Sequence, residues 1–274
     1  MKAFKNRITS GLAICAVFIS VAITGCSEDE VVVSSTSYDL KVVNQLGISG
    51  TVTFTETASE VTTIVIEMTG GDAVSHPAHI HVNSAVEGGS VAISLNPVVN
   101  GRSTTEVTKL DNNAAISYAQ LVGFDGYLNV HQSNSDLNTI VGQTDIGGNA
   151  LTVNSIVYQL AEFGVSGVSG TAKFQQRKNG HALVTIALNG TIVDGIHPAV
   201  IHIGSVATVG GGPAVKILNP VDGTTGMSYS NLKALDDSTP ISYDNLLVYD
   251  GYLAIHQSAL VPEVVLCQGN IGSN

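Results

Sequence analysis

The residues with the clearest capacity for chemistry are the histidines, of which the chain has eight. His79 and His81 are separated by a single residue, and His131 lies in a later segment of alternating residues. Side chains i and i+2 of a β-strand point to the same side, so His79 and His81 share one face while Ala78 and Ile80 take the other. Neutral imidazole nitrogen is a suitable ligand for Zn²⁺ and Cu²⁺. The pattern therefore predicts a copper or zinc site at His79, His81 and His131.

Other histidines extend this prediction. His76 lies just before a proline and is a candidate either for a fourth ligand or for a cap at the start of the strand. A second metal site is expected at His197, His202 and His256. Because Val200 stands where the first set has His79, this second site needs His197 as its third ligand. The alternative interpretation of both sets is a polar cluster that hydrogen-bonds loop carbonyls.

The two sets exist because the chain repeats itself. Residues 124–133 return as 249–258 with identical residues at seven of ten positions, counted directly from the two segments. The triplet Leu-Asn-Pro at 95–97 returns at 218–220, and His-Pro at 76–77 returns at 197–198. Repetition over such a span indicates two copies of one structural unit. We therefore expect an acidic tether over 26–35 followed by two homologous domains, 36–149 and 150–274.

The elements that must position the histidines are expected to be strands. Residues 51–55 alternate between polar and apolar types, and Ile64, Ile66 and Met68 share one face of the next segment, as half-buried strands require. Ser117 with Gln120, and Ser242 with Asn245, form capping boxes that predict one short helix in each copy. We expect an all-β protein of two tandem antiparallel β-sandwich or barrel domains of the Greek-key type, each with one short helix.

The N-terminus has the pattern of a secretory signal. Three basic residues, Lys2, Lys5 and Arg7, precede an apolar segment over 8–23, and the segment ends in Ile-Thr-Gly-Cys. That ending resembles a bacterial lipobox, which implies that residues 1–25 are a lipoprotein signal peptide and that Cys26 is lipidated. The alternatives are an ordinary signal peptide or a membrane anchor. The acidic segment 27–30 resembles a surface-export tag of Gram-negative lipoproteins, so we expect an outer-membrane lipoprotein at the cell surface or the periplasmic face, with the membrane as a partner through its lipid.

Charge and cysteine content narrow the partners. The chain has 11 basic and 22 acidic residues, a net charge of −11, and loss of the three basic residues in 1–25 makes it −14. Such a chain lacks the basic patches that nucleic acids require, so no nucleic-acid partner is expected. Of the three cysteines, Cys15 lies in the signal and Cys26 is the lipidation site, which leaves Cys267 without a disulfide partner. We interpret Cys267 as a buried thiol.

These motifs together resemble the CHRD domain, a family named from chordin. The resemblance is carried by Ala-His-Ile-His at 78–81, Tyr-Leu-Asn-Val-His at 127–131 and Ile-Val-Gly-Gln at 140–143, and it covers both copies. The closing Gly-Glu-Ile-Arg strand of the family is reduced to Asn-Thr-Ile-Val at 138–141, and Cys267 replaces the glycine in the second copy. The resemblance implies a β-rich fold but no settled activity. The histidine strands also resemble the copper-ligand strands of Cu/Zn superoxide dismutase.

Dismutase activity is not expected, because no histidine lies between His81 and His131 to build a zinc subsite and the net charge repels an anion. No Gly-x-Ser-x-Gly motif of a hydrolase is present. We expect a lipid-anchored cell-envelope protein that serves binding, adhesion or structure without enzymatic activity, recognises a protein or glycan ligand, and carries a histidine-bound copper or zinc. The alternative is a copper- or zinc-binding redox or metal-handling protein related to superoxide dismutase.

Overall fold

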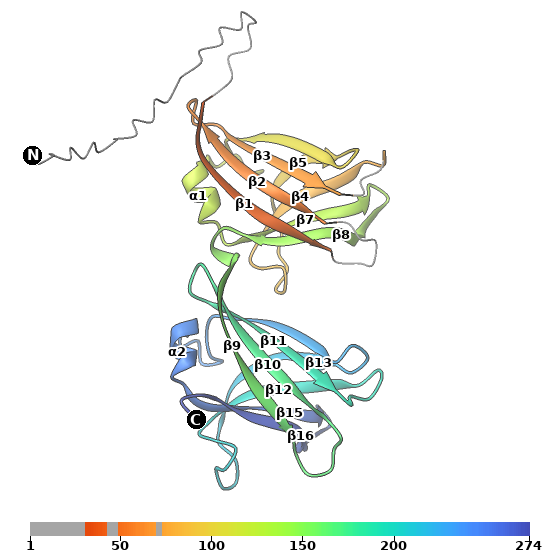
Figure 1. Ribbon diagram of the computed structural model, residues 1–274, viewed down its shortest axis with the longest axis vertical. Coiled ribbons are helices and arrows are strands. Elements are labelled where there is room, and N and C mark those ends of the chain that lie inside the picture. The colour runs from red at the N-terminus through yellow and green to blue at the C-terminus, as the bar shows by residue number, and fades with distance from the viewer. Residues whose placement is uncertain (1–30, 43–48, 70–72) are drawn as a thin grey trace, which may run out of the picture. The chain divides into compact units, whose positions relative to one another are not determined.

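The structure is a computed structural model that describes residues 31–42, 49–69 and 73–274. The predicted signal peptide 1–25, the lipidation site Cys26 and the acidic segment 27–30 lie outside the described residues. Each sequence repeat forms its own eight-stranded antiparallel sheet (Figure 1).

The first repeat contains eight strands, one α-helix and one short 3₁₀-helix. These are β1 (Val32–Val42), β2 (Gly50–Thr57), β3 (Thr62–Met68), β4 (His76–Val82), β5 (Val91–Val98), β6 (Arg102–Val107), α1 (Tyr118–Val122), β7 (Gly126–Ser133), β8 (Asp136–Ile146) and η1 (Gly147–Asn149). Strand β1 begins inside the segment 26–35 that we predicted as a tether, so residues 32–35 belong to the sheet instead.

The second repeat contains the same elements except for the 3₁₀-helix. These are β9 (Leu151–Glu162), β10 (Ser169–Arg177), β11 (Ala182–Asn189), β12 (Ile196–Ile203), β13 (Ala214–Asp222), β14 (Met227–Leu232), α2 (Tyr243–Leu247), β15 (Asp250–Ser258) and β16 (Val261–Gly272).

The strand order is that of a Greek key. The first sheet runs β5-β4-β7-β8-β1-β2-β3-β6, and the second is a closed barrel in which the equivalent strands follow the same cyclic order. In the first repeat β3 pairs with β6, and β4 pairs with β7. Strands β3 and β4 are therefore consecutive in the chain but not neighbours in the sheet, as are β6 and β7, and the connection within each of these pairs crosses other strands. The expectation of two tandem antiparallel β-domains of Greek-key type is confirmed.

Each repeat has its own apolar core, and alternation along the strands fills it. In the first repeat Val52 and Phe54 of β2 and Ile64 and Ile66 of β3 are buried, while the residues between them are half-buried or exposed. Burial of such side chains contributes about 1.5–3 kcal/mol each. The period-two pattern therefore places one face of each strand inside the barrel and leaves the other face to interact with loops and solvent.

The two predicted helices are confirmed. Helix α1 begins after Ser117, whose hydroxyl accepts from the backbone N–H of Gln120 while the Gln120 side chain accepts from the backbone of Ser117. Helix α2 has the same capping box between Ser242 and Asn245. Among the described residues, no helix is long and apolar enough to cross a membrane.

In each repeat an asparagine joins two strands, β5 with β6 in the first repeat and β13 with β14 in the second, and we call this junction the asparagine seam. The backbone N–H of Asn96 on β5 donates to Thr105 Oγ1 at 2.9 Å, and its Nδ2 donates to the carbonyl of Thr104 at 2.7 Å. In return, the hydroxyl of Ser103 donates to the Asn96 carbonyl at 2.6 Å. Asn219 makes the equivalent three bonds between β13 and β14, which also pair directly. This is the structural role of the repeated Leu-Asn-Pro triplet.

The two repeats share one compact unit, Val31–Asn274, and a buried arginine links them. Arg177 of β10 is fully buried; its Nη1 donates to Asp145 Oδ2 at 2.7 Å and its Nε donates to Asn231 Oδ1 at 2.8 Å. A second ion pair joins Lys233 Nζ to Glu87 Oε1 at 2.7 Å. The bonds of Arg177 replace part of the hydration that the buried guanidinium loses, while its Nη2 has no partner among the described residues.

Candidate metal centre

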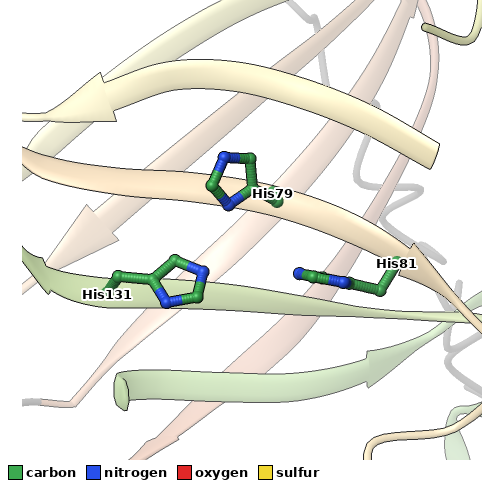
Figure 2. A group of neighbouring side chains, drawn as sticks. All are labelled: His79, His81 and His131. Carbon is green, nitrogen blue, oxygen red and sulfur yellow. The ribbon is translucent and has the colours of Figure 1, made fainter. Parts of the chain in front are cut away.

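Three histidines from two adjacent strands converge on the outer face of the first sheet. His79 and His81 come from β4 and His131 comes from β7, and one ring nitrogen of each lies within 4.8 Å of the others. Figure 2 shows the three rings turned toward one another. On the opposite side of the same strands, Ala78 and Ile80 are fully buried in the core. The expectation that His79 and His81 share the face opposite Ala78 and Ile80 is therefore confirmed, and the ring of His131 lies next to theirs.

The spacing of the three rings suits a metal ion with modest adjustment. The ring centroid of His79 lies 5.1 Å from that of His131 and 5.9 Å from that of His81. Imidazole–zinc bonds of about 2.0–2.1 Å place tetrahedral donors about 3.4 Å apart. The ring nitrogens therefore need to approach by about 1–1.5 Å at most, which rotation about the side-chain bonds supplies.

Backbone carbonyls fix the orientation of two of the rings. Nδ1 of His81 donates to the carbonyl of Gly89 at 3.0 Å, and Nδ1 of His131 donates to the carbonyl of Leu137 at 2.6 Å. A carbonyl only accepts, so the proton of each neutral ring is on Nδ1 and the lone pair is on Nε2. Nε2 of His81 is buried and has no hydrogen-bond partner among the described residues. Metal-binding histidines typically have this arrangement, with one nitrogen held by the protein and the other free.

Two of the three rings, those of His81 and His131, are buried, and the loop between β4 and β5 packs against one of them. His81 is only 9% exposed and His131 only 6%, although both lie on the side away from the core. The loop between β4 and β5 approaches so closely that a Cβ on Gly89 would lie 2.1 Å from the carbonyl oxygen of Val82. Only glycine fits there, and this residue supplies the carbonyl that holds His81. The loop glycine is therefore a part of the site that histidine spacing alone does not reveal.

The electrostatic surroundings favour the neutral form of the rings. Burial lowers the pKa of His79, and the neighbouring imidazoles of His131 and His81 lower it further, while Asp111 opposes them. Burial also lowers the pKa of His81, against the opposing hydrogen bond to Gly89. Only neutral imidazole offers a lone pair to a metal, so both shifts keep these two rings in the form that binds.

His76 has a different role in the described structure. It is in phase with Ala78 and Ile80, not with His79, and it is 4% exposed. Its Nδ1 donates to the carbonyl of His131 at 3.1 Å, which ties the start of β4 to the end of β7. It does not belong to the group of three whose ring nitrogens converge. The two predictions for His76 are a fourth ligand and a cap at the start of the strand, and the contact with β7 agrees with the cap.

The second repeat keeps most of this arrangement but loses one ligand. His202 lies flat against Tyr252 with ring centroids 4.8 Å apart, and its Nδ1 donates to the carbonyl of Gly212 at 2.8 Å. His256 lies 6.1 Å from His202, ring centre to ring centre. The Nδ1 of His197 donates instead to the carbonyl of Gln257 at 2.9 Å, a bond that resembles the His76 contact but reaches one residue further along the partner strand. Among the residues that the structure describes, no third histidine joins His202 and His256.

A hollow of about 400 Å³ is lined by residues of β5, β6 and the loop after β6 in the first repeat. Ser94 and Asp111 are among the residues that line it, and Ser94 is directly opposite His79 on the neighbouring strand. Asp111 accepts hydrogen bonds from both the backbone and the hydroxyl of Ser94. The Asp111 carboxylate also acts to raise the pKa of His79, and the spacing of the histidines does not reveal this effect because it depends on the loop after β6.

Comparisons with protein-family models, with curated proteins and with solved structures give no match to this chain. The resemblance to the CHRD domain, and to the copper-ligand strands of Cu/Zn superoxide dismutase, therefore stays a prediction from the sequence motifs. The convergence of His79, His81 and His131 is the feature of the described residues that points to a function.

Proposed function

We propose that the protein binds one Cu²⁺ or Zn²⁺ ion through His79, His81 and His131 of its first repeat. The observation that carries this proposal is the buried Nε2 of His81, which has no partner among the described residues and is directed into a group of three imidazoles. A buried polar atom without a partner costs about 1–3 kcal/mol, and coordination would remove that cost. Neutral nitrogen donors favour copper or zinc over calcium or magnesium, which prefer oxygen.

The site offers an ion three protein ligands and one open position. Structural zinc sites are usually closed by four protein ligands, whereas sites that exchange a ligand or bind a substrate keep a position free. The group contains no cysteine or carboxylate. This supports metal handling or ligand binding at the ion over a purely structural role.

The test is the metal content of the untagged chain from Ser27 onward, measured by plasma mass spectrometry after equilibration with Cu²⁺ and Zn²⁺ and removal of loosely bound ions. We expect about one ion per chain, and almost none in a His79→Ala/His81→Ala variant. His181→Ala is the matched control, because His181 lies outside the group and should leave the ion bound. A metal-free wild-type chain, or an ion that survives in the double variant, would overturn the proposal.

We further propose that the mature chain is a lipoprotein of the outer membrane. The support is the ending Ile-Thr-Gly-Cys of the N-terminal apolar segment. When the full chain is expressed and the cells are fractionated, the wild-type protein should be found with the membranes. The Cys26→Ala variant should no longer form a mature lipoprotein. Protease treatment of intact cells separates the two locations, since only a surface-exposed chain would be cleaved.

A second function, the binding of a protein or glycan partner, is favoured by apolar loop residues in the second repeat. Val165 is 99% exposed and Leu260 is 93% exposed, and Ile192 and Val193 are also exposed. They lie in the connections β9–β10, β11–β12 and β15–β16, which the antiparallel order brings to one end of the barrel. Exposed apolar groups of this kind often mark contact surfaces. Comparing adhesion of cells that express the wild-type chain with those that express Val165→Ser/Leu260→Ser tests it; equal adhesion would contradict it.

A further inference from the structure

Asn129 occupies the centre of the histidine group on the outer face of the first sheet. It lies directly opposite His79 in the pairing of β4 with β7, and it is two residues before His131 on the same strand. His81 lies opposite Tyr127, one step diagonally from Asn129. Nearest neighbours on one face of a sheet are about 4.5–8 Å apart, so all three imidazoles adjoin this one amide.

The orientation of the amide is fixed by a neighbouring strand. Gln143 on β8 lies directly opposite Asn129, and its Nε2 donates to Oδ1 of Asn129 at 2.9 Å. Because Oδ1 of Asn129 accepts this bond, the other polar group of the side chain is its NH₂, which can donate two hydrogen bonds. Among the described residues, Nδ2 of Asn129 has no partner. The residue is only 6% exposed, so this donor lies in a confined space beside the histidines.

The second repeat shows that the fold does not require this amide. Ala254 stands at the position of Asn129 and pairs with Val200, which stands at the position of His79. Ala254 is 2% exposed, and β12, β15 and β16 pair around it in the same register. The pair His79 and Asn129 is therefore replaced as a unit, while Gln268 keeps the place of Gln143. Asn129 is present in the repeat that has the third imidazole, that of His79, and is absent from the repeat that lacks it. We therefore assign Asn129 to the histidine site and not to the stability of the barrel.

We propose that the Asn129 amide holds a small anion, bound through oxygen or nitrogen, at the open position of the metal. This inference rests on the proposed function, since it needs an ion on His79, His81 and His131. An NH₂ group cannot itself ligate a metal, but it can donate to an anion that does. Three neutral imidazoles leave the charge of a divalent ion uncompensated, so a monovalent anion such as a carboxylate, bicarbonate or hydroxide is the ligand that this site favours. Gln143 is a positioning residue that keeps the amide turned the right way.

The test uses azide as a probe anion on the copper-loaded chain from Ser27 onward, which contains the whole compact unit Val31–Asn274. Azide bound to Cu²⁺ gives a charge-transfer absorption band, and electron paramagnetic resonance follows the copper at the same time. We expect Asn129→Ala to keep one copper per chain and to bind azide about tenfold more weakly, the loss typical of one hydrogen bond to a charged group. Asn129→Asp should weaken azide further, because a carboxylate repels the anion.

Variants at the glutamines separate positioning from general damage. Gln143→Ala should weaken azide about threefold, because the amide loses its fixed orientation but not its donor. Gln268→Ala, the matched change in the second repeat, should leave azide affinity unchanged. Equal azide affinity in copper-loaded wild type and Asn129→Ala would overturn this inference alone, as would loss of copper from Asn129→Ala. A wild-type chain that binds no copper would overturn the proposed function and this inference together.

Discussion

The imidazole of His81 lies flat on the ring of Tyr127, with centroids 4.8 Å apart and an angle of 12° between the planes. His202 and Tyr252 repeat this stack with the same distance and angle. In both repeats Nδ1 of the histidine donates to a loop glycine that has no room for a Cβ, Gly89 or Gly212. The histidine–tyrosine stack of the site is therefore built twice, and the second copy lacks the counterparts of His79 and Asn129.

That difference predicts a gain of function. Val200 is half-buried opposite Ala254, and Nε2 of the nearby His202 is buried without a partner among the described residues. The double change Val200→His/Ala254→Asn should give the second repeat three imidazoles and raise the metal content from about one to about two ions per chain by plasma mass spectrometry. Val193→His, on an exposed loop of the same repeat, is the control and should add no ion. If the metal content stayed at one ion per chain, the stack of His202 on Tyr252 would not be sufficient to build a metal site.

The asparagine seam predicts a local loss of stability. Asn96→Ala removes the bond from Nδ2 to the carbonyl of Thr104, and the backbone bridge between Val99 and Arg102 joins only the turn that connects β5 with β6. We expect a cost of about 1 kcal/mol in the free energy of unfolding, measured by urea denaturation, and faster amide exchange in β5 and β6. Asn138→Ala, at an exposed position on β8, should change neither. Unchanged exchange in β5 and β6 would mean that the seam is closed by packing alone.

The sequence predicted the parts of the structure that depend on short-range patterns. Alternation placed Ile64 and Ile66 in the core, the capping boxes placed both helices, and the His-x-His spacing put His79 and His81 on the outer face. Each of these follows from the geometry of one strand or one helical turn, which a few adjacent residues determine.

The sequence could not predict what depends on loops and on contacts between distant strands. Two of the histidine rings are oriented by carbonyls from other segments, that of Gly89 in the loop between β4 and β5 and that of Leu137 at the start of β8. The burial of Arg177 depends on Asp145 and Asn231, which are 32 and 54 residues away. The alternation of β10 gives no sign that this charged residue is fully buried. Three-dimensional pairing, which no local period encodes, decides these features.

Because its thiol is buried, we predict that Cys267 is unreactive in the folded protein. Cys267 is fully buried on β16, and burial raises the pKa of its thiol to about 12. Because the thiolate is the reactive form, almost none is present at pH 8, and a disulfide reagent such as DTNB should label the native chain from Ser27 negligibly over an hour. In guanidinium the same chain should release one equivalent at once. Rapid labelling of the native chain would show that β16 opens and that this thiol is accessible to reagents.

The ion pair between the repeats predicts a loss of stability in acid. Burial tends to raise the pKa of Glu87, but hydrogen bonds from Lys233, Ser84 and Asn231 outweigh it and hold the pKa at about 2. An unfolded glutamate titrates near about 4.3, so the unfolded chain takes up the proton first as the pH falls. The stabilisation is therefore complete above about pH 4.3 and is lost as the pH falls through about 2.

Comparison with Glu87→Gln isolates this contribution. The variant keeps the shape of the side chain but not its charge, so its urea midpoint should lie below that of the wild type at pH 6, and the gap should narrow steadily between pH 4.3 and pH 2. Glu106→Gln, an exposed change in the same repeat, serves as the control and should follow the wild-type curve. A gap that stays constant across this range would assign the effect of the variant to lost packing, because only the charged form of Glu87 strengthens the contact with Lys233.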